Sequence, residues 1–286
     1  MPHAYTNGIV TFYEDTRPRQ VGDAAPPVLL IHGHSTDLRL WDYQVPALLK
    51  ARFRVVRYDV RGHGRSLIPP SGYTWEEYAA DLGDLLDRIN VDRPVTESLS
   101  IDAVHLVGAS MGGGIALQYA LDHPQRVLSL TLIDSALPGF SYSPEFTAQV
   151  EALVEAVRSE GPRKAFERLW LSQPLFDGVR RFPDRFAALR EMVLAYPAAD
   201  YRPGALPAGY RPTVIDRLAE VRAPALVIVG ERDIADFQLI AGLLAENLPD
   251  ARKLVLPDCG HLPPLEAPEA LNAALVAFLR EASPVG

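Results

Sequence analysis

Residues 108–112 read Gly-Ala-Ser-Met-Gly, a G-x-S-x-G pattern directly behind the apolar run of residues 103–107. Apolar side chains then recur at helical spacing over residues 115–120. A strand that turns sharply into a helix at Ser110 exposes the serine hydroxyl above the edge of a sheet. The flanking glycines suit the close backbone approach that such a turn requires. The pattern therefore predicts a serine nucleophile.

A serine hydroxyl attacks readily only when an imidazole accepts its proton and a carboxylate orients that imidazole. Asp233 lies just past the apolar run of residues 225–229, and His261 follows the run of residues 253–256. The carboxyl ends of parallel strands meet at one edge of a sheet. We therefore expect Ser110, Asp233 and His261 to form a catalytic triad there.

The acid of this triad has an alternative. Asp134 ends the apolar run of residues 127–133 and would stand at the same edge of the sheet. Only one carboxylate within hydrogen-bond reach is needed to orient the imidazole. We favour Asp233, and Asp134 remains as the alternative acid or as a cap of the turn that follows it.

The elements that must position these residues alternate along the chain. Behind a strand pair near residues 8–14, apolar runs are separated by amphipathic segments, which implies a parallel sheet covered on both faces. The predicted strands cover residues 28–32, 53–59, 103–107, 127–134, 225–229 and 253–256, and the predicted helices residues 41–51, 74–89, 237–248 and 268–280.

The alternation fails over residues 137–212, which are helical in pattern but interrupted by prolines and rich in aromatic residues. These aromatic side chains either pack the segment onto the rest of the chain or line an apolar substrate pocket. Trp170 and Phe140 are candidate substrate contacts. We expect a core domain of residues 1–136 and 213–286, with residues 137–212 as a helical lid, or cap. Four of its arginines, Arg180, Arg181, Arg185 and Arg190, fit a solvated face, but one that turned inward would bind a substrate carboxylate.

The composition of the chain excludes several classes of binding partner and site. Its 286 residues carry a formal net charge of −8, which argues against nucleic acid or an anionic membrane surface. Cys259 is the only cysteine, so neither an intramolecular disulfide nor a multi-cysteine metal site can form. We find no apolar run of membrane-spanning length and no secretory signal pattern at the start. We therefore expect a cytoplasmic protein, a monomer or homodimer, with a small-molecule substrate.

Five motifs together resemble the α/β-hydrolases, in particular the lid-bearing esterase and lactonase-like branch. They are His32-Gly33, the segment from Asp59 to Ser66, the serine pentapeptide, Gly230-x-x-Asp233, and Gly260-His261 followed by Glu266. The resemblance implies a mostly parallel eight-stranded sheet flanked by helices, with a helical lid inserted after the sixth strand. The order Ser, Asp, His agrees with this family, although some members take their acid from the strand end that Asp134 occupies here.

The same resemblance assigns the oxyanion hole to the backbone N–H groups of Met111 and His34. His34 replaces the usual apolar or aromatic residue, and because no carboxylate to orient it is evident, we do not expect it to be a general base. The family pattern gives His32 a structural role in its loop, and we expect the same of His63. No cofactor and no metal are implied.

A serine at position 110 excludes the dehalogenases and epoxide hydrolases of this fold, which carry an aspartate nucleophile. The expected function is cleavage of a carboxylic ester, or of a lactone, of a small and largely apolar substrate through an acyl-enzyme on Ser110. Alternatives are an enzyme similar to 3-oxoadipate enol-lactonase, a C–C bond hydrolase of aromatic degradation, and a non-catalytic ligand receptor that keeps the triad.

Overall fold

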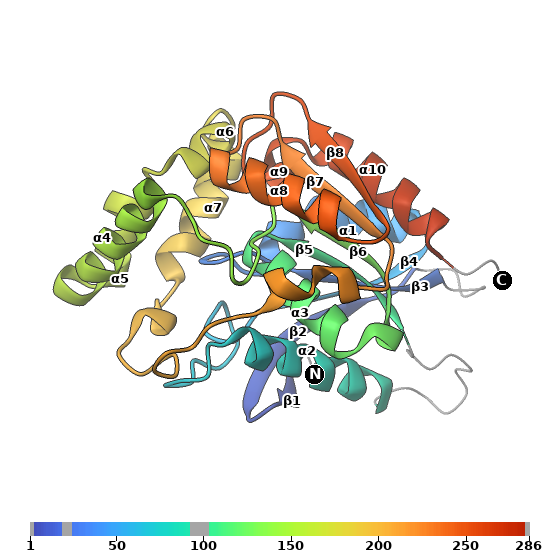
Figure 1. The fold of residues 1–286 in the computed structure, drawn as a ribbon, viewed down its shortest axis with the longest axis horizontal. Helices are drawn as coiled ribbons and strands as arrows, with labels where there is room; N and C mark the ends of the chain where they lie inside the picture. Colours follow the sequence, from blue (N-terminus) through green and yellow to red (C-terminus); the bar gives the residue numbers. More distant parts are fainter. Residues whose placement is uncertain (1–2, 19–24, 92–102, 284–286) are drawn as a thin grey trace.

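An eight-stranded sheet forms the centre of the computed structural model, which describes residues 3–18, 25–91 and 103–283 (Figure 1). The strands are β1 (His3–Thr6), β2 (Ile9–Thr16), β3 (Ala25–Ile31), β4 (Phe53–Tyr58), β5 (Val104–Ala109), β6 (Val127–Ile133), β7 (Ala225–Gly230) and β8 (Ala251–Leu256). Their order across the sheet is β1-β2-β4-β3-β5-β6-β7-β8. The β1–β2 and β2–β4 pairs are antiparallel, and the other pairs are parallel. The predicted mostly parallel sheet is confirmed.

The central strands are buried on both faces because their sequences are continuously apolar. Val28, Leu29, Leu30 and Ile31 of β3 are each 0% exposed. Adjacent side chains of a strand point to opposite faces, so such a run requires helices on both sides. The sequence therefore places β3, and β5 beside it, in the middle of the molecule.

Helices flank this sheet in two groups. The α-helices outside the region between β6 and β7 are α1 (Gln44–Lys50), α2 (Trp75–Val91), α3 (Met111–Asp122), α8 (Ala235–Asn247), α9 (Pro263–Glu266) and α10 (Pro268–Glu281). α1 contacts α10, whereas α2 contacts α3. The helix expected over residues 41–51 is shorter, because a 3₁₀ turn, η1 (Leu38–Trp41), precedes α1. Short 3₁₀ turns also occur at η2 (Pro124–Arg126) and η6 (Val214–Glu220).

The segment of residues 137–212, here called the helical insert, lies within the connection between β6 and β7. It holds α4 (Pro144–Glu160), α5 (Pro162–Ala165), a π-helical turn η3 (Phe166–Trp170), η4 (Pro174–Phe176), α6 (Asp177–Arg180), α7 (Pro183–Ala195) and η5 (Ala199–Tyr201). Its helices, green to yellow in Figure 1, lie together at one end of the molecule. Four of the prolines begin a helix, where a missing N–H breaks no hydrogen bond, so they divide the insert into short helices.

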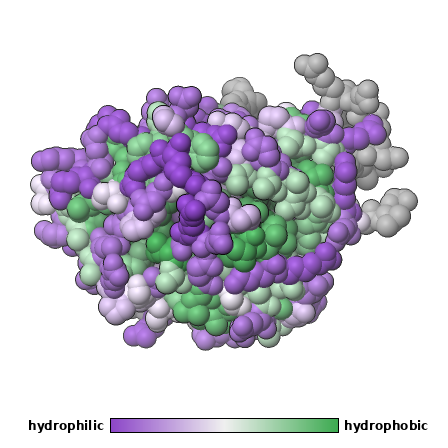
Figure 2. Space-filling model, turned by 90° about the horizontal axis from the view of Figure 1, so that it is seen from above, coloured by the Kyte–Doolittle hydropathy of each residue, from purple (hydrophilic) through white to green (hydrophobic). Residues whose placement is uncertain are grey.

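The surface of the described residues is mixed in character. Figure 2 shows hydrophilic residues spread over one face, with hydrophobic patches between them. In the described ranges, we find no helix that combines the length and the apolar character needed to cross a membrane.

Candidate active site

Ser110 lies at the turn between β5 and α3, with φ 50° and ψ −118°. A non-glycine residue adopts such a backbone only under strain, which is typical of a serine held out for attack. The two glycines of the pentapeptide are required by close packing. A Cβ on Gly108 would lie 2.2 Å from the Gly112 carbonyl oxygen, and one on Gly112 would lie 2.1 Å from the Ile31 carbonyl oxygen.

His261 stands between Ser110 and Asp233. Its Nε2 lies 3.1 Å from Ser110 Oγ, and its Nδ1 lies 2.7 Å from Asp233 Oδ2. An Nδ1–H that donates to the carboxylate leaves Nε2 free to accept the serine proton. The histidine is 6% exposed and the Asp233 side chain is 0% exposed, so the relay is shielded from water except at the serine. The structure brings the three predicted residues together.

Glu266 holds the loop that carries the histidine. Its Oε2 accepts a hydrogen bond from the Gly260 N–H at 2.6 Å, and its Oε1 accepts one from the Leu262 N–H at 3.0 Å. These two N–H groups flank His261 on either side. The glutamate was visible as part of a motif, but its role could not be read from the sequence because it depends on a turn that brings residue 266 back to residues 260 and 262.

Asp134, the alternative acid, is fully buried beside Asp233 and not hydrogen-bonded to the histidine. Its Oδ1 accepts a hydrogen bond from the Gly230 N–H at 2.9 Å, while Oδ2 meets no donor. Burial, together with the charge of Asp233, raises the pKa of Asp134 well above its usual value. A neutral Asp134 can donate from Oδ2 to Asp233, so this residue fits a supporting role behind the triad.

Asp134, Asp233 and His261 are also a group of possible metal ligands among the described residues, with ligand atoms within 4.8 Å of one another. The hydrogen bonds of the triad already use the imidazole Nδ1 and an oxygen of Asp233. This donor set fits a proton relay better than an ion site, because a metal would have to displace that hydrogen bond.

Two backbone N–H groups close to Ser110 fit an oxyanion hole. Met111 begins α3, and the N–H of a first helical residue has no partner within its own helix. His34 follows Gly33, where an added Cβ would be 3.2 Å from the Ser110 Cβ. Among the residues that the structure describes, no acceptor takes the N–H of His34, whereas the N–H of Ser35 donates to His63.

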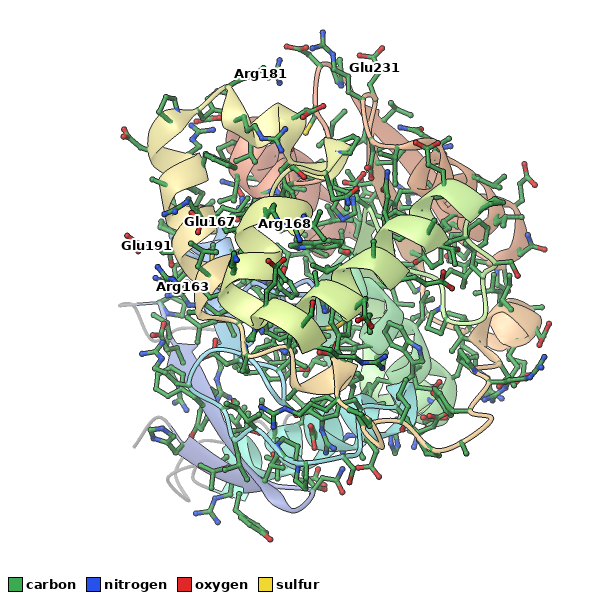
Figure 3. All side chains as sticks on the ribbon, turned by 90° about the vertical axis from the view of Figure 1, so that its left-hand side faces the viewer. Arg163, Glu167, Arg168, Arg181, Glu191 and Glu231 are labelled. Atoms are coloured by element: carbon green, nitrogen blue, oxygen red, sulfur yellow. The ribbon has the colours of Figure 1, made fainter. Side chains whose placement is uncertain are left out.

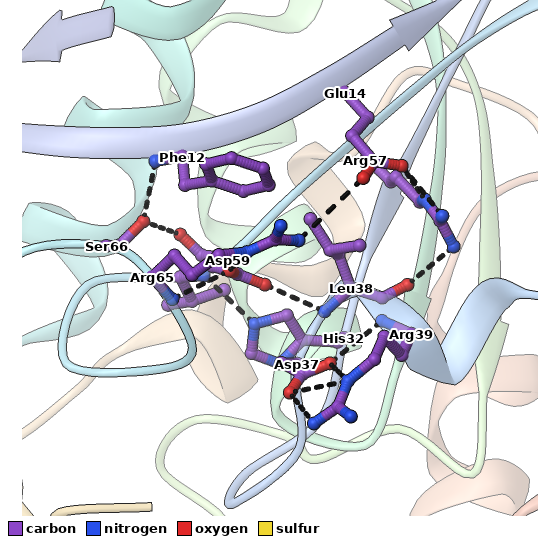
Figure 4. A network of polar contacts seen from close by, with 11 residues as sticks. Phe12, Glu14, His32, Asp37, Leu38, Arg39, Arg57, Asp59, Arg65 and Ser66 are labelled. Carbon is purple, nitrogen blue, oxygen red and sulfur yellow. Dashed lines mark hydrogen bonds and ion pairs between the residues drawn. The ribbon is translucent and has the colours of Figure 1, made fainter. Parts of the chain in front are cut away.

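A polar network fixes the loop that carries His34 (Figure 4). His32 donates from Nδ1 to the Gly33 carbonyl and accepts at Nε2 from the Val60 N–H, at 2.8 and 2.9 Å. Asp59 accepts from the N–H groups of Leu38 and Arg65 at 2.9 and 2.8 Å. Burial lowers the pKa of His32, so it stays neutral and can accept from the backbone. These contacts agree with its expected structural role.

His63 supports the same loop from the other side. Its Nδ1 donates to the Arg61 carbonyl at 3.0 Å, and its Nε2 accepts from the Ser35 N–H at 3.3 Å. Burial lowers the pKa of His63 to about 3. A ring that stays neutral at physiological pH can serve as the acceptor that Ser35 needs.

The side chain of His34 has a partner that the sequence did not reveal. Its Nε2 lies 3.2 Å from Oδ2 of Asp200, a residue of the helical insert 166 positions along the chain. The expectation that no carboxylate orients this histidine is therefore wrong. The pair went unseen because only the packing of the insert over the loop after β3 brings η5 to it.

Ser110 and His261 open into a cavity of about 510 Å³. Its walls are mainly aromatic and aliphatic, from the core as well as from the helical insert: Tyr73, Trp75, Tyr78, Tyr142, Phe146, Val150, Trp170, Leu175, Phe176, Tyr201, Leu206, Tyr210, Phe237 and Leu262. Trp170 lines the cavity, as expected of a substrate contact. Phe140 does not, because it packs edge-on against Tyr142 with ring centres 5.2 Å apart and borders a separate hollow.

Among the described residues, no lysine or arginine lines this cavity, and its carboxylates outside the triad are Glu151 and Asp200. The four arginines considered as carboxylate ligands, Arg180, Arg181, Arg185 and Arg190, have other partners. Arg180 pairs with Asp177 and Arg190 with Glu167. Arg181 donates to Asp258 at 2.9 Å, and Arg185 donates to the Leu265 carbonyl at 2.7 Å. Figure 3 shows Arg181 and Glu191 at the margin of the molecule. The arginines fit the solvated face.

Curated proteins that resemble this chain cover most of its length. A dihydrolipoyllysine-residue acetyltransferase component of an acetoin cleaving system from Pseudomonas putida is 31% identical over 91% of this chain. The chain spans just under two thirds of the first curated relatives that it matches, 65% of this one and 64% of the next.

Two solved structures share the fold over nearly their whole length. A thermophilic esterase from Thermogutta terrifontis, solved with malate bound, is 31% identical with a TM-score of 0.79, covering 99% of this chain and 98% of that one. The enol-lactonase from Burkholderia xenovorans LB400 is 28% identical with a TM-score of 0.80, covering 98% and 100%. Residues 26–268 match the family described as alpha/beta hydrolase fold. The chain belongs to the α/β-hydrolase fold family.

Proposed function

We propose that this chain is a serine hydrolase that cleaves carboxylic esters, or neutral lactones, of small and largely apolar substrates. The observation that carries the proposal is the relay from Ser110 through His261 to Asp233, which opens into an apolar cavity. The similarity to an esterase and to an enol-lactonase supports the same class of reaction.

The first half of the reaction forms an acyl-enzyme. Ser110 Oγ attacks the carbonyl carbon while its proton passes to Nε2 of His261, and Asp233 stabilises the resulting imidazolium. The negative oxygen of the tetrahedral intermediate accepts hydrogen bonds from the N–H groups of His34 and Met111. The intermediate collapses, and His261 returns the proton to the departing alcohol.

The second half releases the acid. Water enters beside His261, which accepts a proton as the water oxygen attacks the acyl carbon on Ser110. The second tetrahedral intermediate uses the same backbone donors. When it collapses, the proton returns to Ser110 Oγ, so the enzyme is restored with the carboxylic acid as product.

The charge of the cavity favours uncharged substrates. A substrate carboxylate buried in this cavity would meet Glu151 and Asp200, and no arginine or lysine from the described residues to pair with it. Burying an unpaired anion is costly. This argues against the alternative of an enol-lactonase acting on an anionic substrate. A neutral ester or lactone avoids that cost and gains from contact with the aromatic walls.

Turnover of a substrate panel tests the proposal. Neutral p-nitrophenyl esters of short acyl chains, neutral lactones and a ring-fission-type diketone are incubated with the enzyme. We expect sustained ester hydrolysis that Ser110→Ala lowers about 10⁶-fold in kcat. Ser159→Ala, which removes an exposed hydroxyl on α4, is the matched control and retains full activity. A single-turnover burst without sustained release would favour the receptor alternative. Exclusive cleavage of the diketone would favour the C–C hydrolase.

A further inference from the structure

Two side chains of the helical insert hold the loop that carries the oxyanion donor. Asp200 Oδ2 lies 3.2 Å from Nε2 of His34. Trp170 Nε1 donates a hydrogen bond to the Oγ of Ser35 at 2.8 Å. His34 and Ser35 directly follow Gly33, which packs against Ser110. The insert therefore contacts two consecutive residues at the point where the backbone N–H must be aimed.

Asp200 is itself firmly placed and charged. The Tyr196 hydroxyl donates to its Oδ1, and the Asp200 side chain is only 15% exposed. Although burial alone would raise the pKa of Asp200, the hydrogen bonds and the charge of His34 outweigh it and hold the pKa below its usual value. An ionised carboxylate makes stronger hydrogen bonds than a neutral group, so it is a suitable anchor for the imidazole of His34.

Aromatic rings close around the same histidine. The ring of Tyr201 stacks on His34 with centres 5.5 Å apart, and Tyr196 meets it edge-on at 4.9 Å. Tyr196 also stacks on His63 at 4.4 Å, the residue that accepts the Ser35 N–H. The His34 side chain is thus fixed in direction by rings as well as by the carboxylate.

The backbone is irregular at each of these contacts. Ser35 has φ +60°, and Ala198, which precedes η5, has φ +51°. Trp170 ends a π-helical turn in which the Leu171 N–H donates to the Phe166 carbonyl, five residues earlier. Positive φ at a non-glycine residue costs on the order of 1–3 kcal/mol, and π turns occur frequently at functional sites. Such backbone conformations persist only where surrounding contacts impose them.

We propose that Asp200 and Trp170 are positioning residues of the hydrolytic reaction. They act through the side chains of His34 and Ser35 to aim the backbone N–H of His34 at the oxyanion. The inference rests on the proposed function, since the donor matters only if a tetrahedral intermediate forms. It gives the helical insert a part in stabilising the transition state, in addition to lining the cavity.

The test combines single and double variants with a transition-state analogue. Asp200→Ala and His34→Ala each leave the backbone N–H in place but remove its anchor. Because loss of one oxyanion donor costs about 10²–10³ in kcat, misaiming it should cost about 10–100-fold. We expect kcat for p-nitrophenyl butyrate to fall by that factor while KM changes little. The inhibition constant of phenylboronic acid, whose adduct on serine mimics the tetrahedral state, should rise in proportion.

The double variant separates an effect through His34 from an effect of Asp200 alone. If the carboxylate acts through the imidazole, removing Asp200 has no further effect once His34 has been removed. The kcat of the double variant should then equal the kcat of His34→Ala. Additive losses, an unchanged kcat, or a higher KM with unchanged boronate inhibition would each overturn the proposal. Trp170→Phe keeps the apolar ring but removes Nε1–H, so it provides a second variant if Asp200→Ala fails to fold, and a smaller loss of kcat with weaker boronate inhibition is expected.

A control variant monitors general damage to the insert. Glu167→Gln removes a carboxylate that pairs with Arg190 and does not line the active-site cavity, so its kinetics should equal those of the wild type. A wild type that hydrolyses no member of the panel and binds no phenylboronic acid would contradict the proposed function, and this inference with it. An active wild type with an unaffected Asp200→Ala variant would contradict the inference alone.

Discussion

The edge of the sheet and the helical insert position their functional groups by different means. At the sheet edge, Ser110, Asp233 and His261 each follow a strand, and backbone hydrogen bonds set the distances between those strands. In the insert, Asp200 and Trp170 reach the loop after β3 through side chains on irregular turns. The comparison indicates that regular structure places the reacting atoms, while side-chain packing decides what surrounds them.

The sheet and the helical insert also differ in the groups that surround a histidine. In the sheet, His105 is 0% exposed, and its ring nitrogens lie 2.8 and 3.2 Å from the hydroxyls of Ser129 and Ser283, while its ring packs edge-on against Phe53. In the insert, the carboxylate of Asp200 stands against His34. Burial in the sheet disfavours the charged form of His105, whereas His34 at the insert has a carboxylate, Asp200, as its hydrogen-bond partner.

The largest change in kcat is expected for a substitution in the candidate triad at the sheet edge. Asp233→Asn should lower kcat about 10⁴-fold because an amide cannot stabilise the imidazolium and favours the wrong tautomer. Asp134→Asn should change kcat less than about threefold, because its amide oxygen can accept from the Gly230 N–H and its NH₂ can donate to Asp233, as the neutral acid does. Steady-state kinetics with p-nitrophenyl butyrate measure both variants. The reverse ranking would move the acid of the triad to Asp134.

The next effect concerns the buried histidine of β5. Burial lowers the pKa of His105 to about 4, below the value near 6.5 of the unfolded chain. Between these pH values the unfolded chain binds the proton and the folded chain does not. Stability is therefore full above pH 6.5 and is lost as the pH falls, by about 2 kcal/mol from this residue between pH 7 and pH 5.

Urea unfolding at pH 7 and pH 5 measures that loss. His105→Gln cannot titrate, so its free energy of unfolding should fall less between the two pH values than that of the wild type. Ser129→Ala keeps the histidine and serves as the matched control, since it weakens the fold but should retain the pH dependence. Equal pH dependence in His105→Gln and the wild type would show that the sheet does not exclude this charge.

The smallest change is expected in kcat/KM when the charge of the cavity lining is altered. Glu151→Lys on α4 should raise kcat/KM for an anionic ester, p-nitrophenyl hemiglutarate, by about fivefold, an effect limited by solvent screening at this exposed position. Hydrolysis of neutral p-nitrophenyl butyrate should change less than twofold. Glu155→Lys makes the same charge change one turn along α4, outside the cavity lining, and should leave both rates as they are. Equal gains in the two variants would assign the effect to net charge alone.

The sheet and the reacting residues were largely predictable. Strand-like runs of apolar residues and a pentapeptide with two obligatory glycines are local signals, and they located β5 and Ser110 before any tertiary contact was known. The helical insert was predictable only in outline. The sequence predicts that its prolines interrupt helices, whereas four of them begin helices. Phe140 was a natural candidate for the cavity wall, but which aromatic residues face the cavity depends on how short helices pack.

The candidate nucleophile Ser110, the candidate base His261 and the parallel sheet can be predicted from the sequence alone, because each depends on residues close together in the chain or on the order of the strands. The preference for Asp233 over Asp134, two carboxylates at neighbouring strand ends, comes from tertiary packing, since the distance of 2.7 Å between Asp233 Oδ2 and His261 Nδ1 is a matter of atomic position. The tertiary structure also brought Asp200 to His34, because contacts between residues 166 positions apart arise from packing. Local sequence patterns specify strands and helices, whereas the packing of those strands and helices determines which distant side chains are in contact.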